Sequence, residues 1–261
     1  MLKTRVWTAA VALPTVLAVV IFAPNRFFTL FVAALGGWEL YEVATFTSAR
    51  SAASIAAVVL AGGGSMLALI AGGGASWTVP AMMTLVMLAL VAMVAVAGGA
   101  AAPKGFPLTL IGSAYVGLLF PYFALLRNLD GGIAAFIFML LVVVASDTGA
   151  YFAGRSLGRH KLAPKVSPQK TMEGAVGGFV ASLAAGWILR MALEPGWTPA
   201  AAIGAAAAIG VLAQFGDLAG SALKRSAGVK DSGWIFPGHG GLLDRSCSLV
   251  FACVFTYYYC K

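Results

Sequence analysis

A short polar stretch in the second half of the chain gathers the residue types that bind metal-complexed phosphates. Residues 217–245 hold carboxylates, cations, glycines and a histidine, while the segments on either side are almost entirely apolar. Charged side chains are costly to place beside a membrane, so such a cluster indicates a functional site. The members that we single out are Asp217, Ser221, Lys224, Arg225, Lys230, Asp231, Gly238, His239, Gly240, Gly241, Asp244 and Arg245.

Each residue type in this stretch suits a polyphosphate that carries a divalent cation. Mg²⁺ prefers oxygen ligands and is usually held by one or two carboxylates together with substrate phosphates. Arg binds phosphate bidentately, and Lys binds it as a point charge. The glycines around His239 allow backbone N–H groups to approach an anion closely. The combination therefore favours phosphate chemistry over a purely structural role.

A second polar segment lies upstream and adds a carboxylate and further cations. Asp147 ends an apolar run, and a loop follows that is rich in Lys and Arg. Taken alone, a basic loop beside a membrane more often sets topology or contacts anionic lipid, and a lone Asp at a helix end more often caps it. The hydroxyls and the cation of this loop precede a predicted helix N-terminus, which favours anions. The candidates here are Asp147, Ser167, Lys170, Thr171 and Glu173.

The composition predicts the elements that position these residues. Of the 261 residues, 61% are hydrophobic and 10% are charged, whereas an ordinary soluble domain is about 25% charged. Many apolar stretches reach the roughly 17–25 residues that a membrane helix needs. We therefore predict an all-α, polytopic integral membrane protein with about nine transmembrane helices, at residues 6–23, 27–44, 52–70, 79–97, 106–126, 132–151, 174–193, 199–216 and 243–260.

The distribution of charge predicts how these spans are oriented. If the spans alternate from a cytoplasmic N-terminus, thirteen of the 17 Lys and Arg residues fall on the cytoplasmic face and four on the other, as the positive-inside rule requires. Topology then explains the net charge of +8 better than nucleic-acid binding does. We expect residues 1–131 to form about five spans, and residues 132–261 to form a catalytic membrane region of about four spans with cytoplasmic polar loops.

The polar stretch resembles the signature of the phosphatidate cytidylyltransferase (CDP-diacylglycerol synthase) family. The matching pattern is Ser221-x-x-Lys224-Arg225-x4-Lys230-Asp231-x-Gly233-x3-Pro237-Gly-His-Gly-Gly241-x-x-Asp244-Arg245. Two shorter matches, Ser146-Asp-Thr-Gly-Ala-Tyr151 and Ser167-Pro-Gln-Lys-Thr-x-Glu173-Gly, are similar to further motifs of that family. The motifs cover roughly residues 145–248, and the N-terminal half is similar only in having several spans.

The resemblance implies that CTP and phosphatidate react to give CDP-diacylglycerol and pyrophosphate, with Mg²⁺ on Asp217 and Asp244. The implied catalytic residues are Asp217, Asp244, Lys224, Arg225, Lys230, Asp231, His239 and Arg245. The implied substrate-binding residues are Ser167, Lys170, Thr171, Glu173, Ser221, Gly238, Gly240, Gly241 and Asp147. A bacterial inner (cytoplasmic) membrane location follows, with the active site facing the cytoplasm. The resemblance leaves open a second, monovalent ion and a homodimer.

One departure from the family pattern keeps other interpretations open. The family continues Asp-Arg-x-Asp, whereas here a thiol, Cys247, stands in place of the second carboxylate. Because a thiol is a poor Mg²⁺ ligand, the chain could be an inactive homologue, and restoring the acid by Cys247→Asp tests whether its loss matters. A CTP-dependent lipid kinase is a second alternative. A secondary transporter that uses Asp147 and Asp217 as ion sites is a third.

Overall fold

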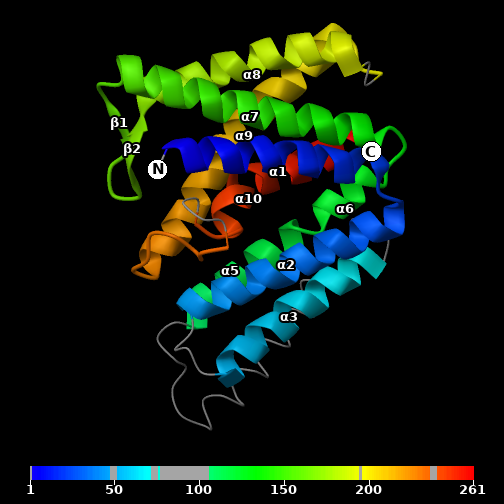
Figure 1. The fold of residues 1–261 in the computed structure, drawn as a ribbon, viewed down its shortest axis with the longest axis vertical. Helices are drawn as coiled ribbons and strands as arrows, with labels where there is room; N and C mark the ends of the chain where they lie inside the picture. Colours follow the sequence, from blue (N-terminus) through cyan, green and yellow to red (C-terminus); the bar gives the residue numbers. More distant parts are fainter. Residues whose placement is uncertain (1, 48–51, 72–75, 77–105, 194–195, 236–239) are drawn as a thin grey trace. The chain divides into compact units, whose positions relative to one another are not determined.

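Apolar helices make up most of the chain that the structure describes (Figure 1). The computed structural model describes residues 2–47, 52–71, 76, 106–193, 196–235 and 240–261. Five helical segments in these ranges are long and apolar enough to cross a membrane: Asn25–Thr47, Pro107–Arg127, Gly132–Leu157, Met172–Leu193 and Pro199–Ser226. The expected all-α membrane protein is confirmed at this level. The expected span at residues 79–97 lies outside the described residues.

The chain divides into two compact units, and each is described separately. Residues 1–125 and 223–244 form the first unit. It contains α1 (Leu2–Phe22), α2 (Asn25–Thr47), α3 (Ala52–Ala71) and α5 (Phe106–Leu119). Helices α2, α3 and α5 pack against one another, and glycines allow the close approach: a Cβ at Gly62 would overlap the Leu40 side chain, and one at Gly117 would overlap the backbone of Gly62.

Residues 126–222 and 245–261 form the second unit. It contains α7 (Gly132–Leu157), strands β1 (Lys161–Ala163) and β2 (Ser167–Thr171), and α8 (Met172–Leu193). Most of α9 (Pro199–Ser226) and α10 (Leu243–Cys260) also belongs to it, while the end of α9 and the start of α10 belong to the first unit. The short α6 (Tyr122–Arg127) lies at the junction of the two ranges along the chain.

Small residues let α7 and α8 pack closely along their length, side by side as Figure 1 shows. A Cβ at Gly149 would overlap Ala181, and a Cβ at Gly177 would overlap Ala153. Membrane helices use such small residues at their contacts because lipid supplies no hydrophobic force between helices, which leaves close packing to hold them together. The close contact fixes the ends of α7 and α8, and these ends carry the hairpin described next.

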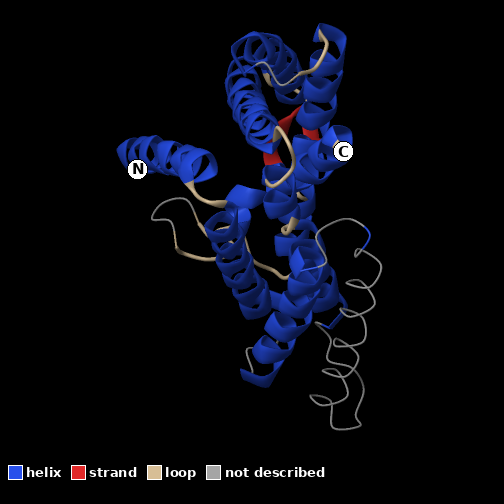
Figure 2. Cartoon of the chain, turned by 90° about the vertical axis from the view of Figure 1, so that its right-hand side faces the viewer, coloured by secondary structure: helices blue, strands red, loops and turns tan. Residues whose placement is uncertain are grey.

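A two-stranded antiparallel hairpin connects α7 to α8, and Figure 2 shows it as the short red element among blue helices. Lys161 pairs with Thr171, and Ala163 pairs with Ser167. The sequence analysis expected a polar loop here and not strands. Strand β1 has three residues and β2 has five. Such short strands show no alternation of apolar and polar residues, so the sequence does not reveal that they pair.

Within the described residues, the helix bounds lie within four residues of the expected spans except at three places. One of these is α7, which continues to Leu157 and does not end at residue 151. Residues 106–126 form α5 and α6 with a break at Phe120 and Pro121, because proline has no backbone N–H to continue the helix. Helix α9 continues ten residues beyond the expected end at residue 216 and stops at Ser226. The apolar run ends at residue 216. The helix continues beyond it because Asp217, Lys224 and Arg225 are compatible with a helix.

Candidate functional site

The hairpin places Lys170 beside a carboxylate of α9. Lys170 lies in β2, and its Nζ is 2.8 Å from Asp217 Oδ2. The Lys170 side chain is 24% exposed and the Asp217 side chain is 42% exposed. Solvent therefore screens the attraction between them, and a ligand can reach both groups. The structure therefore joins one residue of each polar segment that the sequence analysis singled out.

A pocket of about 410 Å³ surrounds this ion pair within the second unit. Asp147 of α7 lines it, and Ser248 of α10 donates a hydrogen bond of 3.3 Å to Asp147 Oδ2. Gln214 of α9 donates to the Ala175 carbonyl of α8 at 3.0 Å and so ties two walls together. The lining residues are Asp147, Ala150, Tyr151, Gly154, Arg155, Leu162, Ser167, Gln169, Lys170, Thr171, Gly174, Ala175, Gln214 and Asp217.

The charges that line the pocket suit an anion that carries a metal. Lys170 and Arg155 offer positive charge, while Asp147 and Asp217 offer carboxylate oxygens. An unaccompanied anion would be repelled by the two carboxylates, and an unaccompanied cation by the two basic groups. A phosphate with a bound divalent cation satisfies both sets of charges at once.

Two predicted substrate-binding residues at the base of the hairpin make structural contacts. Thr171 is buried, and its Oγ1 accepts a 3.1 Å hydrogen bond from the Gly174 N–H at the start of α8. Glu173 accepts hydrogen bonds from the backbone N–H groups of Arg159 and His160, and lies 2.6 Å from His160 Nδ1. Glu173 thereby ties the chain that enters β1 to the first turn of α8.

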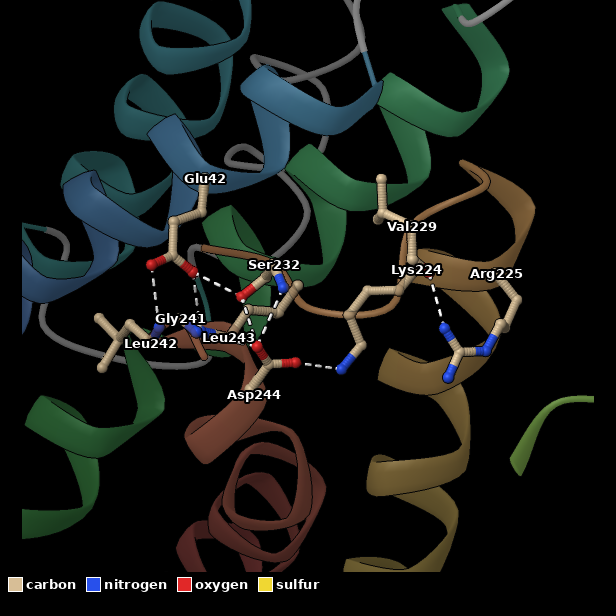
Figure 3. A network of polar contacts seen from close by, with 9 residues as sticks. All are labelled: Glu42, Lys224, Arg225, Val229, Ser232, Gly241, Leu242, Leu243 and Asp244. Atoms are coloured by element: carbon tan, nitrogen blue, oxygen red, sulfur yellow. Dashed lines mark hydrogen bonds and ion pairs between the residues drawn. The ribbon is translucent and has the colours of Figure 1, made fainter. Parts of the chain in front are cut away.

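A second polar cluster lies in the first unit, around Asp244 in the first turn of α10 (Figure 3). Its Oδ1 forms an ion pair with Lys224 of α9, and the two side chains are 8% and 10% exposed. Its Oδ2 accepts hydrogen bonds from the N–H groups of Ser232 and Gly241, each at 2.9 Å, and lies 3.2 Å from Ser232 Oγ. The two oxygens of Asp244 thus have different partners.

Glu42 of α2 joins this cluster from the N-terminal half of the chain. Its carboxylate accepts hydrogen bonds from Ser232 Oγ at 2.8 Å, from the Leu242 N–H at 2.9 Å and from the Leu243 N–H at 3.2 Å. We refer to Glu42, Lys224, Ser232, Gly241 and Asp244, together with these amides, as the Glu42–Asp244 network (Figure 3). The sequence analysis did not select Glu42 or Ser232. An acid inside an apolar span was the available signal for Glu42.

The remaining predicted site residues that the structure describes lie outside the hairpin pocket and the Glu42–Asp244 network as defined above. Arg225 is exposed and donates to the Val229 carbonyl at 2.8 Å, which closes the end of α9. Lys230, Asp231 and Arg245 are exposed, and Ser221 is partly buried in α9. Gly240 has φ +80°, a conformation that favours glycine. Gly238 and His239 lie outside the described residues.

Cys247 packs in the contact between α10 and α9. It is buried, and a Cβ at Gly220 would overlap its Sγ. A Cβ at Gly216 would likewise overlap the Cys247 backbone carbonyl. The thiol that replaces the family carboxylate therefore lies against the backbone of a neighbouring helix.

The donors that the structure offers fit a magnesium ion better than a softer metal. The described residues contain no group of three or more His, Cys, Asp and Glu side chains placed to hold an ion. Mg²⁺ needs no such cage, because it usually binds one or two carboxylates and keeps its other positions for water and phosphate. Asp217 and Asp244 belong to different units, so the expectation that they share one ion stays a prediction.

Comparisons with known proteins agree with the chemistry of these clusters. The model of the cytidylyltransferase family matches residues 3–261. The chain is 44% identical over 145 residues to the phosphatidate cytidylyltransferase of Bacillus subtilis, which is 55% of this chain and 54% of that protein. It is 41% identical over 158 residues to the protein of the same name from Brucella suis, 59% and 56% of the two chains. The chain spans about half the length of the curated relatives it matches.

Proposed function

The chain belongs to the cytidylyltransferase family, and from that membership we propose that it transfers the cytidylyl group of CTP to phosphatidate. The products are CDP-diacylglycerol and pyrophosphate. The relatives named phosphatidate cytidylyltransferase support this assignment. The single observation that carries it in the structure is the pocket in which Lys170 pairs with Asp217 beside Asp147 and Arg155.

In this reaction an oxygen of the phosphatidate phosphate attacks the α-phosphorus of CTP. The bond between the α-phosphorus and the bridging oxygen to the β-phosphorus breaks, and pyrophosphate leaves with the electron pair. The attacking phosphate is already an anion, so it needs little help from a general base. The barrier comes mainly from repulsion between two anions and from the charge of the leaving group, both of which fixed positive charges lower.

The basic residues of both clusters supply that charge in the proposal. Lys170 and Arg155 line the pocket and are placed to contact a phosphate there. We assign Lys224, Arg225, Lys230 and Arg245 to the neutralisation of the CTP phosphates. Ser167 and Thr171 add hydroxyl donors at the same pocket. The Gly240 backbone adds an N–H group, while the Gly241 N–H holds Asp244 Oδ2. The other residues of the assigned set are Asp147, Glu173, Ser221, Asp231, Gly238 and His239.

The metal in this proposal is Mg²⁺, with Asp217 and Asp244 as its protein ligands. When bound, it would neutralise charge on the phosphates and on the departing pyrophosphate. Each carboxylate already faces a lysine, and these two ion pairs support the proposal of a cation at each. In Asp244, Oδ2 is held by two backbone N–H groups, so Oδ1 is the oxygen that can exchange its lysine partner for a metal.

The proposed setting is a bacterial inner membrane with about nine spans and the polar loops in the cytoplasm. The positive-inside distribution of Lys and Arg supports this orientation. Labelling single cysteines from either side of sealed vesicles tests it. A cysteine at position 165, in the hairpin turn, should react from the cytoplasmic side, and one at position 128 should react from the other side.

The experiment that tests the reaction compares two labelled forms of CTP. Purified protein is incubated with phosphatidate, Mg²⁺ and CTP labelled at either the α- or the γ-phosphate. A cytidylyltransferase moves the α-label into lipid and releases the γ-label as pyrophosphate. A lipid kinase would move the γ-label into lipid and release CDP, which would overturn the proposal. So would an absence of labelled lipid with either form.

Two further components belong to the proposal. One is a second, monovalent cation, which is tested by replacing K⁺ and Na⁺ with choline in the same assay. The other is a homodimer in the membrane, which is tested by crosslinking before detergent extraction. Loss of rate in choline supports the first, and a crosslinked band of twice the mass supports the second.

A further inference from the structure

Glu42 is a buried carboxylate in α2 whose charge needs compensation. Its residue is 3% exposed, and a buried carboxylate is costly unless hydrogen bonds or opposite charges stabilise it. Both of its oxygens accept backbone N–H hydrogen bonds, from Leu242 and from Leu243. Trp38 Nε1, one turn earlier in α2, donates a further bond of 3.0 Å.

The start of α10 supplies most of this compensation. The first N–H groups of a helix have no partner within the helix, and the helix dipole favours negative charge there. A Ser, Thr, Asp or Asn at the N-cap usually accepts these N–H groups. Here Leu242 precedes the first helical residue and its side chain has no acceptor, so Glu42 takes the Leu242 and Leu243 N–H groups from a distant segment.

Ser232 links this cap to Asp244. Its Oγ lies 2.8 Å from Glu42 Oε2 and 3.2 Å from Asp244 Oδ2. Gly241 closes the arrangement, because a Cβ there would overlap both Ser232 Oγ and the Glu42 carboxylate. Ser232 Oγ and the Glu42 carboxylate therefore leave no room for a further carbon atom at Gly241.

We propose that Glu42 is a positioning residue for the reaction: by capping α10 and holding Ser232, it fixes Asp244 so that Oδ1 faces Lys224 and the metal. This inference rests on the proposed function for its kinetic consequence. It assigns a task to a residue of the N-terminal half, which the signature motifs do not include. Glu42 acts through Asp244 and does not itself contact substrate.

Replacing the carboxylate by its amide tests the proposal, because Glu42→Gln keeps the size but loses an acceptor. The amide NH₂ would face the Leu242 or Leu243 N–H, so one donor loses its partner. We expect the Mg²⁺ concentration for half-maximal rate to rise about 10- to 100-fold, the range typical of residues that orient metal ligands. Amide hydrogen exchange in residues 240–250 should rise as well. Glu42→Asp keeps the charge but is one methylene shorter. Its Mg²⁺ midpoint and its exchange in residues 240–250 should lie between those of the wild type and those of Glu42→Gln.

Glu39→Gln is the matched control, because Glu39 is also a buried acid of α2 and is not a member of the Glu42–Asp244 network. It should leave both the Mg²⁺ midpoint and the exchange of residues 240–250 unchanged. A folded Glu42→Gln protein that behaves like Glu39→Gln in both measurements would overturn the proposal. A lower rate with an unchanged Mg²⁺ midpoint and unchanged exchange would do the same.

The exchange measurement separates this proposal from the proposed function. If the wild-type protein forms no CDP-lipid, the proposed function fails, while the exchange of residues 240–250 still decides whether Glu42 caps α10. If Glu42→Gln does not fold, Ser232→Ala replaces it, because that variant removes only the bridging hydroxyl. A raised Mg²⁺ midpoint or faster exchange then supports the proposal, and wild-type values in both overturn it.

Discussion

Glu42 and Asp244 meet at one serine hydroxyl, although they lie in opposite halves of the chain: Ser232 Oγ is 2.8 Å from Glu42 Oε2 and 3.2 Å from Asp244 Oδ2. A hydroxyl has one hydrogen to donate, so the two carboxylates share it. The remaining donors divide between them, since Glu42 takes the Leu242 and Leu243 amides, and Asp244 takes Lys224. This division explains how two acids can lie near one another in a mostly buried network.

Removing the cation of this network should destabilise the protein. Lys224→Met leaves Asp244 buried without its charged partner, and breaking such a pair costs about 3–5 kcal/mol. Thermal unfolding in detergent should show a lowered midpoint. The double variant Lys224→Met with Asp244→Asn should lose less than the sum of the single variants. Additive losses would show that the two side chains do not interact, and Arg225→Ala is the exposed neighbour for comparison.

Filling the space at Gly241 should disturb the same network. A Cβ there overlaps Ser232 Oγ and Glu42 Oε2, so Gly241→Ala should cost about 1–3 kcal/mol through overpacking. Gly204→Ala is the control, because a Cβ at Gly204 meets nothing within 4 Å, and it should stabilise α9 by about 0.5–1 kcal/mol. Equal unfolding temperatures for the two variants would contradict the close packing at Gly241.

Replacing Lys170 in the hairpin pocket should lower activity and change stability little. The Lys170–Asp217 pair is partly exposed, so Lys170→Ala should change the free energy of unfolding by about 0–1 kcal/mol. Its rate of CDP-lipid formation should fall about 100-fold or more, as when one fixed electrostatic donor is removed from a reacting centre. Lys165→Ala, in the exposed turn of the same hairpin, should retain activity. Similar rates for both variants would argue against a phosphate contact at Lys170.

Two roles can be distinguished for Glu173: a structural role in the hairpin and a direct contact with substrate. The sequence analysis assigned it to substrate, while the structure shows it bound to the Arg159 and His160 N–H groups. Glu173→Ala should therefore speed amide exchange in residues 159–171 and lower activity by displacing Lys170. Activity lost without any change in exchange would instead favour a direct substrate contact.

Restoring the family carboxylate at position 247 should not improve the enzyme. Cys247 is buried, and its Sγ lies where α9 approaches at Gly220. Cys247→Asp places a larger, charged group in that contact, so we expect a lower unfolding temperature and no gain in rate. Cys247→Ser keeps the size and serves as control. A higher rate for the Asp variant at unchanged stability would show that the missing acid limits activity.

The sequence predicts the elements of this protein better than the contacts between them. The bounds of α10 match the expected span at residues 243–260, and the placement of Lys170 before a helix follows from the motif around it. The cap of α10 by Glu42 could not be predicted, because the two segments are separated by most of the chain and only packing brings them together. The hairpin was missed because its strands are too short to show a period.

Asparagine at the two proposed metal ligands tests the central claim most directly. Asp217→Asn and Asp244→Asn keep the size of each side chain but remove its negative charge, so the rate of CDP-lipid formation from CTP and phosphatidate is measured over a range of Mg²⁺ concentrations. The account predicts that each folded variant loses at least about 10³-fold in rate at the Mg²⁺ concentration that saturates the wild type. Near-wild-type rates for either folded variant at that Mg²⁺ concentration would contradict it.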